Sequence, residues 1–557
     1  MQFIIKSFVC SFLLIPCLSF AQTTYLPLGS KEYILLERME IKAQTDSVLN
    51  FSKTKPYSRK QMVVAAQRLD SALSFSAADR YNLHSLKLNN IEWALGDRND
   101  FKSKKPIWKN FYKTPSNLFE VHNKDLSLII NPFIYYQVSK ESGNSQHLFL
   151  NRRGLHIRGR IAEKIGFDAS ISDNQERDPL YVQRWVNDHQ AVPGNGFYQD
   201  FKTTGYDYFD GRGYITFNVA KFIDVAFGYD KHFIGNGYRS LFLSDFSNSA
   251  LFLKLNTRIW KFNYQNLFME LHAAEPRAAN VLYPKKYAAM HHLDVNVTKW
   301  LNVGLFEGII FGRKNHFEFG YLNPIIFYRS AEQQNGSFDN SVAGLDFKAN
   351  VAKKFQFYGQ LLLDEFKLSE IKAADGWWGN KYGYQLGAKY IDAFRISNLD
   401  LQVELNRIRP FTYSHNDSVA NYTHYNQPLA HPLGANFTEV IGIARYQPRP
   451  KWMLEGKLVF YKQGLDVSGE SYGANIMLPN RPPYRIKDYG FNTGSGQPVK
   501  TVYGSLLVSY ELRQNMFFEL SGFIRRYRVE NNAGLSENTS IISAAFRWNI
   551  GRREFVF

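Results

Sequence analysis

Short runs in which apolar and polar residues alternate constrain the fold of this chain more than any other feature. In the run 399–406, LDLQVELN, every odd-numbered residue is Leu or Val and every even-numbered residue is polar. The same period of two recurs at 355–364, 502–511, 518–524 and 542–550. Each run has roughly the length of one tilted strand that crosses a membrane, about 9–11 residues. The pattern therefore predicts β-strands with one apolar face and one polar face.

Aromatic residues are abundant and make up 16% of the chain. Transmembrane barrels place aromatic side chains in girdles at both water interfaces, whereas a secreted β-sandwich would use them in its core. In lipid every backbone N–H and C=O must be paired within the protein, so strands can cross only as a closed cylinder. We expect an all-β transmembrane barrel of about 18 antiparallel strands over residues 106–557, with the β-sandwich as the alternative.

The chain ends shortly after the run 542–550, on Phe557. We expect the run to form the final strand and to close the cylinder by pairing with the first strand. Phe557 is then expected at a membrane interface, because barrels of this kind commonly end in an aromatic residue that the assembly machinery reads.

The N-terminus has the features of a secretory signal peptide. Lys6 precedes an apolar run from Phe8 to Phe20, and Ser19-Phe20-Ala21 forms a small-x-small cleavage site. The run is too short to span a membrane as a helix. We expect residues 1–21 to be removed after Ala21 and the mature protein to reach the outer membrane of a Gram-negative bacterium.

Residues 22–105 follow a helical period instead. A helix is expected over 31–42, Ser58 and Gln61 have the spacing of a capping box, and Ser76 is placed to begin a third helix. Three short amphipathic helices predict a small bundle. A wide barrel would leak unless its lumen were filled, and we expect this bundle to be the plug.

The formal net charge of the chain is +17. Lys and Arg on outer loops could bind acidic surface polysaccharide or the phosphates of lipopolysaccharide. Charge ladders inside the lumen are the alternative explanation. We expect contact with outer-membrane lipid, and nothing in the sequence indicates nucleic acid as a partner.

Three loop regions place aromatic side chains beside hydrogen-bonding side chains, as sugar-binding sites do. The first is 228–246, where Gly235-Asn236-Gly237 predicts a tight turn with positive φ values; a hairpin turn with lumen salt bridges is the alternative. The others are 375–380 and 413–425, which an interfacial aromatic girdle would also explain. The candidate polysaccharide-binding residues are Lys231, Tyr238, Arg239, Asp245, Trp377, Trp378, Tyr413 and His424.

Two further expectations concern charged residues in the barrel region. Arg329, Glu332 and Asp339 are predicted to form a polar network in the lumen rather than a ligand site. Glu307 interrupts the apolar alternation that begins at Leu301. Since a charge facing lipid is costly, a bulge or an inward turn is expected at Glu307.

No catalytic or metal-binding motif stands in the structural context that its chemistry needs. No Gly-x-Ser-x-Gly elbow stands on an expected strand–helix turn, no His-Glu-x-x-His is present, and His291-His292 lacks a partner at ligand spacing. We predict no enzyme activity, no cofactor and no metal.

Several segments resemble one family of outer-membrane proteins. The resemblance covers most of the mature chain and is carried by the order and spacing of six segments: 25–41, 54–61, 150–176, 228–246, 319–347 and 422–439. They resemble the Wzi-type proteins of capsule assembly, and within them the Bacteroidetes branch of gliding-motility proteins called RemB. The chain departs from the proteobacterial pattern at 234–237, where Ile-Gly-Asn-Gly replaces a Trp-Gly-Pro-Gly turn.

The resemblance implies an eighteen-stranded barrel with a periplasm-side helical plug. It also implies a non-catalytic role in holding capsular or related polysaccharide at the cell surface, with a link to gliding. The alternatives are a structural subunit of a secretion or gliding assembly of the envelope, and a porin-like channel.

Overall fold

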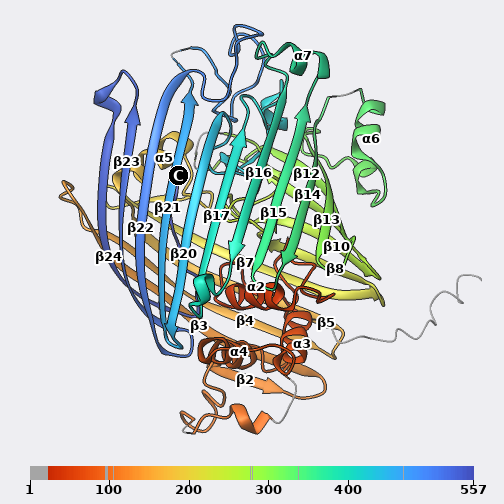
Figure 1. Ribbon diagram of the computed structural model, residues 1–557, viewed down its shortest axis with the longest axis vertical. Helices are drawn as coiled ribbons and strands as arrows, with labels where there is room; N and C mark the ends of the chain where they lie inside the picture. Colours follow the sequence, from red (N-terminus) through yellow and green to blue (C-terminus); the bar gives the residue numbers. More distant parts are fainter. Residues whose placement is uncertain are drawn as a thin grey trace, which may run out of the picture.

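The computed structural model describes residues 23–94, 98–104, 106–275, 278, 280–336, 338–467 and 469–557. The predicted signal peptide lies outside the described residues. Eighteen long antiparallel strands close into a barrel (Figure 1), as predicted. They are β3 (Leu126–Glu141), β4 (Leu148–Ile161), β5 (Ile165–Arg177), β7 (Gly205–Ala220), β8 (Ile223–Asp230), β10 (Ala250–Ile259), β11 (Phe262–His272), β12 (Lys285–Asn296), β13 (Leu301–Phe311), β14 (Asn340–Val351), β15 (Phe355–Glu365), β16 (Lys381–Tyr390), β17 (Leu399–Ile408), β20 (Phe437–Arg449), β21 (Trp452–Leu465), β22 (Gln497–Arg513), β23 (Met516–Val529) and β24 (Glu537–Trp548).

The chain also forms shorter strands and several helices. The strands β2 (Phe119–His122) and β6 (Gln199–Phe201) pair with β3 and β7, β1 (Thr54–Lys55) pairs with β9 (Phe233–Ile234), and β18 (Thr423–His424) pairs with β19 (Gln427–Pro428). The helices are α2 (Glu32–Ala43), α3 (Arg59–Asp70), α4 (Ala77–Asn89), α5 (Leu180–His189), α6 (Tyr328–Gln334) and α7 (Leu368–Ala373). Among the described helices, none is long and apolar enough to cross a bilayer.

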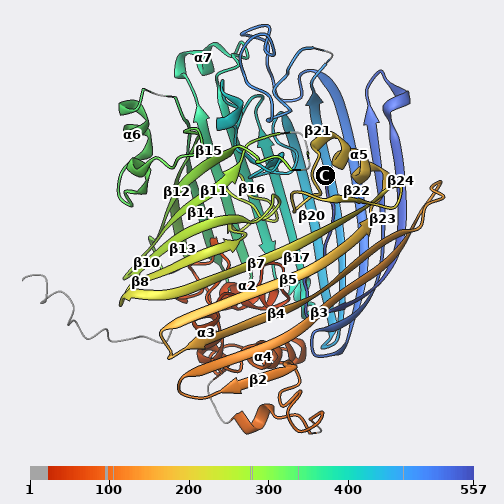
Figure 2. The ribbon, with the colours of Figure 1, turned by 180° about the vertical axis from the view of Figure 1, so that it is seen from behind.

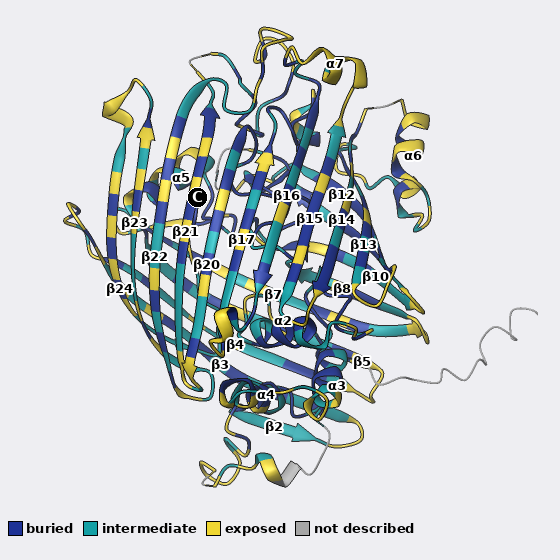
Figure 3. Cartoon of the chain, in the orientation of Figure 1, coloured by how far each residue is buried: buried dark blue, intermediate teal, exposed yellow. Residues whose placement is uncertain are grey.

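The alternation in sequence becomes an alternation of faces in the wall. Leu458, Leu506 and Leu520 point outward and are 67%, 61% and 63% exposed. Inward-facing Glu404 and Gln356 are fully buried. Figure 3 shows the resulting change between buried and exposed residues along single strands. An apolar outer wall around a polar interior is the arrangement that a bilayer requires.

The barrel closes where the sequence predicts, but the chain end lies elsewhere. Strand β24 pairs antiparallel with β3, with Ala544 opposite Val138. Beyond Trp548 the chain turns back into the lumen, and both views show the C-terminus among the strands (Figures 1 and 2). Phe557 packs against Tyr181 and Trp185 of α5, with ring centroids 5.9 and 5.5 Å apart.

The expectation that Phe557 lies at a membrane interface is therefore wrong. The preceding residues explain the turn, because Arg552, Arg553 and Glu554 carry charges that lipid would not accept. Arg553 finds Glu176 at 2.8 Å, and Glu554 pairs with Lys457, both on the inner wall. The last outward aromatic side chain of the final strand is Trp548.

The N-terminal helices form the predicted bundle at one end of the barrel. Ser58 caps α3 by accepting from the backbone N–H of Gln61, and Ser76 forms a reciprocal capping box with Asp79 at α4. The three helices share an apolar core, which contains Leu35, Leu36, Met39, Val63, Ala66, Leu83 and Leu86.

Buried ion pairs join the bundle to the inner wall. Arg38 of α2 pairs with Asp79, with Asp400 of β17 and, at 2.8 Å, with Asp392. Lys348 of β14 lies 2.6 Å from Glu40. Removing one partner of such a buried pair leaves an uncompensated charge, so these contacts fix the position of the bundle in the barrel mouth.

The opposite end of the lumen is filled by loops that fold inward. Leu241, Phe242 and Leu243 are buried in an apolar cluster with inward-facing strand residues such as Phe306, whose ring stacks on Phe242 with centroids 4.4 Å apart. The backbone carbonyls of Leu241 and Phe242 accept hydrogen bonds from two tyrosine hydroxyls of another loop. The chain thus fills its own lumen from both ends.

Candidate functional site

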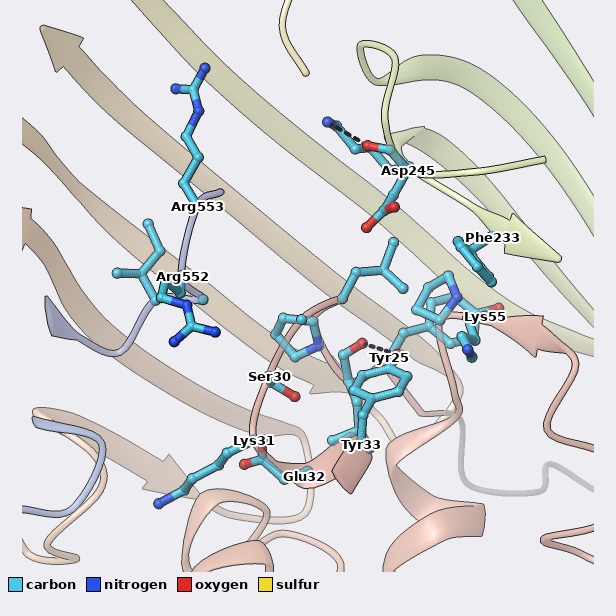
Figure 4. Close-up of a pocket in the computed structure, with 18 of the residues that line it drawn as sticks. Tyr25, Ser30, Lys31, Glu32, Tyr33, Lys55, Phe233, Asp245, Arg552 and Arg553 are labelled. Atoms are coloured by element: carbon cyan, nitrogen blue, oxygen red, sulfur yellow. Dashed lines mark hydrogen bonds between the residues drawn. The ribbon is translucent and has the colours of Figure 1, made fainter. Parts of the chain in front are cut away.

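A charged cavity of about 760 Å³ remains between the two fillings. The bundle and its leading segment form one side, seen in Figure 4 at Tyr25 and Lys31, and the C-terminal tail enters at Arg552 and Arg553. Fourteen Lys and Arg side chains line the cavity, against nine Asp and Glu side chains. The cavity therefore carries an excess of positive charge.

The predicted segment 228–246 crosses this cavity. Its short strand β9 pairs with β1, so Thr54 lies opposite Ile234 and the segment is joined to the bundle side of the chain. Of the three residues of the predicted turn, Gly235 has a positive φ, of 148°. Gly237 is needed for another reason, because a Cβ there would lie 2.5 Å from the Glu404 carboxylate.

Glu404 holds the segment in place from the inner wall. Its carboxylate accepts from the backbone N–H of Tyr238 at 2.6 Å and of Arg239 at 3.0 Å. The Arg239 side chain pairs with Glu439 at 3.0 Å and donates to the carbonyl of Val556. The Tyr238 hydroxyl accepts from Lys457 at 3.1 Å. The side chains of Tyr238 and Arg239 thus make internal contacts.

Lys231 and Asp245 face the cavity. The ammonium of Lys231 donates to the backbone carbonyls of Gly194 and Asp245, at 2.6 and 3.0 Å. Burial, together with repulsion from nearby Arg212, lowers the pKa of Lys231 to about 7. Asp245 is exposed to the cavity.

A second group of aromatic and basic side chains lies at the rim of the barrel, at the end opposite the helical bundle. We call it the rim cluster: Trp377, Trp378, Arg481, Tyr484, Arg485, Lys487 and Tyr489. It joins the loop after α7, at the top of Figure 1, to the loop between β21 and β22. Backbone hydrogen bonds pair the loops, from Phe491 to Gly376 and from Trp378 to Asp488.

A cation–π contact joins the two loops of the rim cluster. The guanidinium of Arg485 lies 4.1 Å from the ring centroid of Trp378, a cation–π distance. Tyr484 and Tyr489 are 42% and 48% exposed, and Arg481 and Lys487 are exposed beside them. These four residues were not among the predicted ligand residues, although the run RPPYRIKDYG combines aromatic and basic residues as 228–246 does.

Two predicted ligand residues are enclosed instead. Tyr413 is 1% exposed, and its hydroxyl donates to the carbonyl of Leu241 at 2.7 Å. His424 is also 1% exposed and accepts from the backbone N–H of His272. Burial lowers the pKa of His424 to about 3. Both side chains belong to the loop packing inside the barrel.

Arg329, Glu332 and Asp339 lie outside the lumen. Arg329 and Glu332 form an ion pair at 2.7 Å within α6, which packs on the outer wall (Figure 1). Asp339 pairs with Arg313 at 2.6 Å and accepts from Tyr321. The residues do form polar contacts, but the segment that carries them folds outward, and the wall beneath it is unusually polar.

Glu307 is one of the polar residues of the outer wall beneath α6. Strand β13 keeps its register through this position, so the expected bulge or inward turn is absent and Glu307 faces outward, opposite His291 and Ala343. Its carboxylate accepts from the backbone N–H of Arg329 at 3.0 Å. The contact with α6 supplies the cover that a bulge would have provided.

Neighbouring His292 faces the lumen and lies 2.8 Å from Asp346. Among the described residues, no three His, Cys, Asp or Glu side chains are grouped as a metal site.

The family model of the capsule assembly protein Wzi matches residues 211–447. This range begins within β7 and ends within β20, so it contains segment 228–246 and about half of the barrel wall. Comparison with curated protein sequences finds no match.

Among solved structures, the chain resembles Wzi of Escherichia coli, an outer-membrane protein involved in group 1 capsule assembly and a carbohydrate-binding β-barrel. The sequences are 13% identical, the TM-score is 0.57, and the match covers 95% of this chain and 100% of the other. OprD of Pseudomonas aeruginosa is also similar, at 13% identity and a TM-score of 0.43 over 76% of this chain and 94% of that one. The likeness to Wzi establishes the fold.

Proposed function

We propose that this chain is a Wzi-type outer-membrane protein that anchors acidic surface polysaccharide, such as capsule, without catalysis. The match of the Wzi family model to residues 211–447 supports the class of function. The Escherichia coli protein with the same fold is a carbohydrate-binding barrel. The apolar outer wall suits insertion in the outer membrane, with the helical bundle on the periplasmic side.

The rim cluster is the proposed binding site for the polysaccharide, and its exposed aromatic–basic pairing carries the proposal. Sugar rings pack on flat aromatic faces, which Tyr484 and Tyr489 present. Carboxylate or phosphate groups of the polymer form charge-assisted hydrogen bonds with Arg and Lys, which Arg481 and Lys487 supply. Trp377 and Trp378 support the same surface from the neighbouring loop.

The other predicted ligand residues have different proposed roles. Arg239, Tyr413 and His424 hold the inner loops together. Tyr238 is part of the same internal contacts. Lys231 and Asp245 are polar groups of the internal cavity, which a sugar polymer bound at the rim would not need to enter. We therefore propose a filled barrel rather than a porin-like channel.

A charge-removal pair tests the rim site. We expect Arg481→Ser/Lys487→Ser in the refolded barrel to bind acidic surface polysaccharide at least tenfold more weakly at physiological salt, about 1.4 kcal/mol. The matched control is Lys353→Ser/Lys354→Ser, in the turn between β14 and β15 at the bundle end. Affinity electrophoresis reports both. Equal binding by the two variants, or none by the parent protein, would refute the proposal.

The resemblance to the RemB branch extends the proposal to gliding. A polymer anchored at the rim would couple surface adhesion to cell movement. Deleting the gene, staining for capsule and filming the cells separates the roles, since loss of movement with intact capsule would favour a structural subunit of a gliding or secretion assembly.

A further inference from the structure

A segment of the chain lies on the outside of the barrel wall. We call residues 313–336 the outer flap; it leaves the wall at the end of β13, contains α6, and returns before β14 (Figure 1). Its Tyr321 and Tyr328 are fully buried against Ile309 and Phe311 of β13. Successive side chains of a strand alternate in direction, and Phe306 and Ile310 face the apolar cluster in the lumen. Ile309 and Phe311 therefore face outward, and the flap covers the outer face.

The wall beneath the flap carries polar side chains that hydrogen-bond to the flap. Three outward-facing polar side chains are satisfied by flap backbone: Glu307 accepts from the N–H of Arg329, while Tyr264 and Asn266 donate to the carbonyl of Pro324 at 2.6 and 3.1 Å. Without the flap these groups would face hydrocarbon without partners, at a cost of several kcal/mol each. The flap is thus a fixed part of the wall.

Three large apolar side chains of the flap are strongly exposed. Phe319, Ile325 and Phe327 are 78%, 82% and 78% exposed, although they lie within nine residues of one another. Several exposed apolar side chains of this size in one short segment indicate a contact surface. The occupant has to be apolar, because these three side chains offer no hydrogen-bonding groups.

The height of the flap on the wall indicates whether its exposed apolar side chains lie beside lipid or in water. Trp300 is exposed in the turn before β13 at the bundle end, where Lys299 accepts from Asn50. Glu307 lies seven residues further along, about 24 Å along the strand at ~3.4 Å per residue. With a tilt of ~40° the rise is about 18 Å, less than the ~25 Å height of an apolar band. Leu305, exposed on the same face just below the flap, continues the band.

We propose that the outer flap is a lipid anchor, with acyl chains of the outer leaflet covering Phe319, Ile325 and Phe327. Part of the flap backbone is paired, by hydrogen bonds from the N–H of Tyr321 to Glu318 and of Ser330 to Phe327 and by the contacts of Arg329 and Pro324 with the wall, and backbone near lipid has to be paired within the protein. The half-exposed Arg329 extends from α6, beside Phe327, and can reach the headgroups. The proposal rests on the proposed insertion in the outer membrane.

Single-cysteine labelling tests the anchor. Produced from Gln22 onward, the chain holds no cysteine, so Ile325→Cys carries one label. Leu458→Cys, outward on β21, is the matched control in the apolar band, and Asn532→Cys, in an exposed turn, is the control in water. The three proteins, refolded into phospholipid vesicles, carry an environment-sensitive fluorophore, which acyl-chain spin-labelled lipid quenches on contact.

We expect quenching at Ile325→Cys within about twofold of Leu458→Cys and little quenching at Asn532→Cys. A water-exposed label at residue 325, with Leu458→Cys quenched, would overturn the anchor and leave the membrane barrel intact. A label whose fluorescence reports an apolar environment but is not quenched by the spin-labelled lipid would also overturn the anchor. It would show that protein, such as a second copy of the chain, covers residue 325. Failure of quenching at Leu458→Cys as well would overturn membrane insertion and the anchor together.

Discussion

The guanidinium of Arg239 donates a hydrogen bond to the backbone carbonyl of Val556 at 2.6 Å, and so ties a loop inside the barrel to the end of the chain. The same side chain pairs with Glu439 of β20 at 3.0 Å. One buried arginine therefore joins the inner loop, the wall and the tail. This contact makes the filling of the lumen a single connected structure.

Replacing this arginine should destabilise the barrel. Arg239→Ala leaves the buried Glu439 without its strongest partner, and breaking a buried pair costs about 3–5 kcal/mol. We expect the free energy of unfolding in detergent to fall by about 3 kcal/mol, measured by urea titration with tryptophan fluorescence. Arg153→Ala, which breaks an exposed pair with Asp173, should cost less than about 1 kcal/mol. Equal losses would contradict the assigned role of Arg239.

Removing residues 551–557 should open a path for ions. An eighteen-stranded wall encloses an aqueous channel unless the chain fills it, and the tail occupies the cavity side of the lumen. In planar bilayers we expect no steady conductance from the parent protein and measurable conductance from the truncated one. Large, steady conductance from the parent protein would instead support the porin-like alternative.

Acid should loosen the helical bundle. Burial by itself would raise the pKa of Asp79, but Arg38 and Lys42 hold it at about 2. Since the folded pKa lies below the ordinary value, the carboxylate stabilises the fold above about pH 4, and the contribution of about 2 kcal/mol is lost as pH falls toward 2. Hydrogen exchange in α2 and α4 should quicken over this range.

An Asp79→Asn variant isolates that effect. It should exchange quickly at neutral pH and lose most of the dependence between pH 4 and 2. Asp70→Asn, at the exposed pair with Lys87 in the same bundle, should behave as the parent protein. A parent-like pH profile for Asp79→Asn would show that other carboxylates control the bundle.

Glu307 should control how firmly the outer flap is held. In Glu307→Ala the backbone N–H of Arg329 loses its acceptor, a change worth about 1–3 kcal/mol. We expect proteases to cleave the flap roughly tenfold faster in detergent, as followed by mass spectrometry. Leu305→Ala, two residues away on the same face, should leave the cleavage rate unchanged. Unchanged cleavage in Glu307→Ala would mean that apolar packing alone holds the flap.

The period of two predicted the wall because it reports directly which side chains face lipid and which face the lumen. Strand β17 shows this, with Val403 exposed and Glu404 fully buried. The pattern carries no information about the direction in which a loop folds. Tyr413 and His424 lie in loops that fold inward, whereas Arg329 lies in one that folds outward.

The predictions for Glu307 and Phe557 were wrong for a physical reason. The outward Glu307 is tolerated because a segment 22 residues away along the chain covers it. Phe557 fits the usual ending of a barrel chain, but the charges of 552–554 find partners only inside. In both cases the deciding contact is made by residues outside the strand.

Capsule retention by living cells tests the central claim most directly. The chromosomal gene is replaced by the Arg481→Ser/Lys487→Ser variant, and cell-bound and shed polysaccharide are measured in strains with equal amounts of folded protein in the outer membrane. We predict that total polysaccharide stays the same while most of it moves from the cells to the medium. Cell-bound polysaccharide at the parental level would contradict anchoring at the rim cluster.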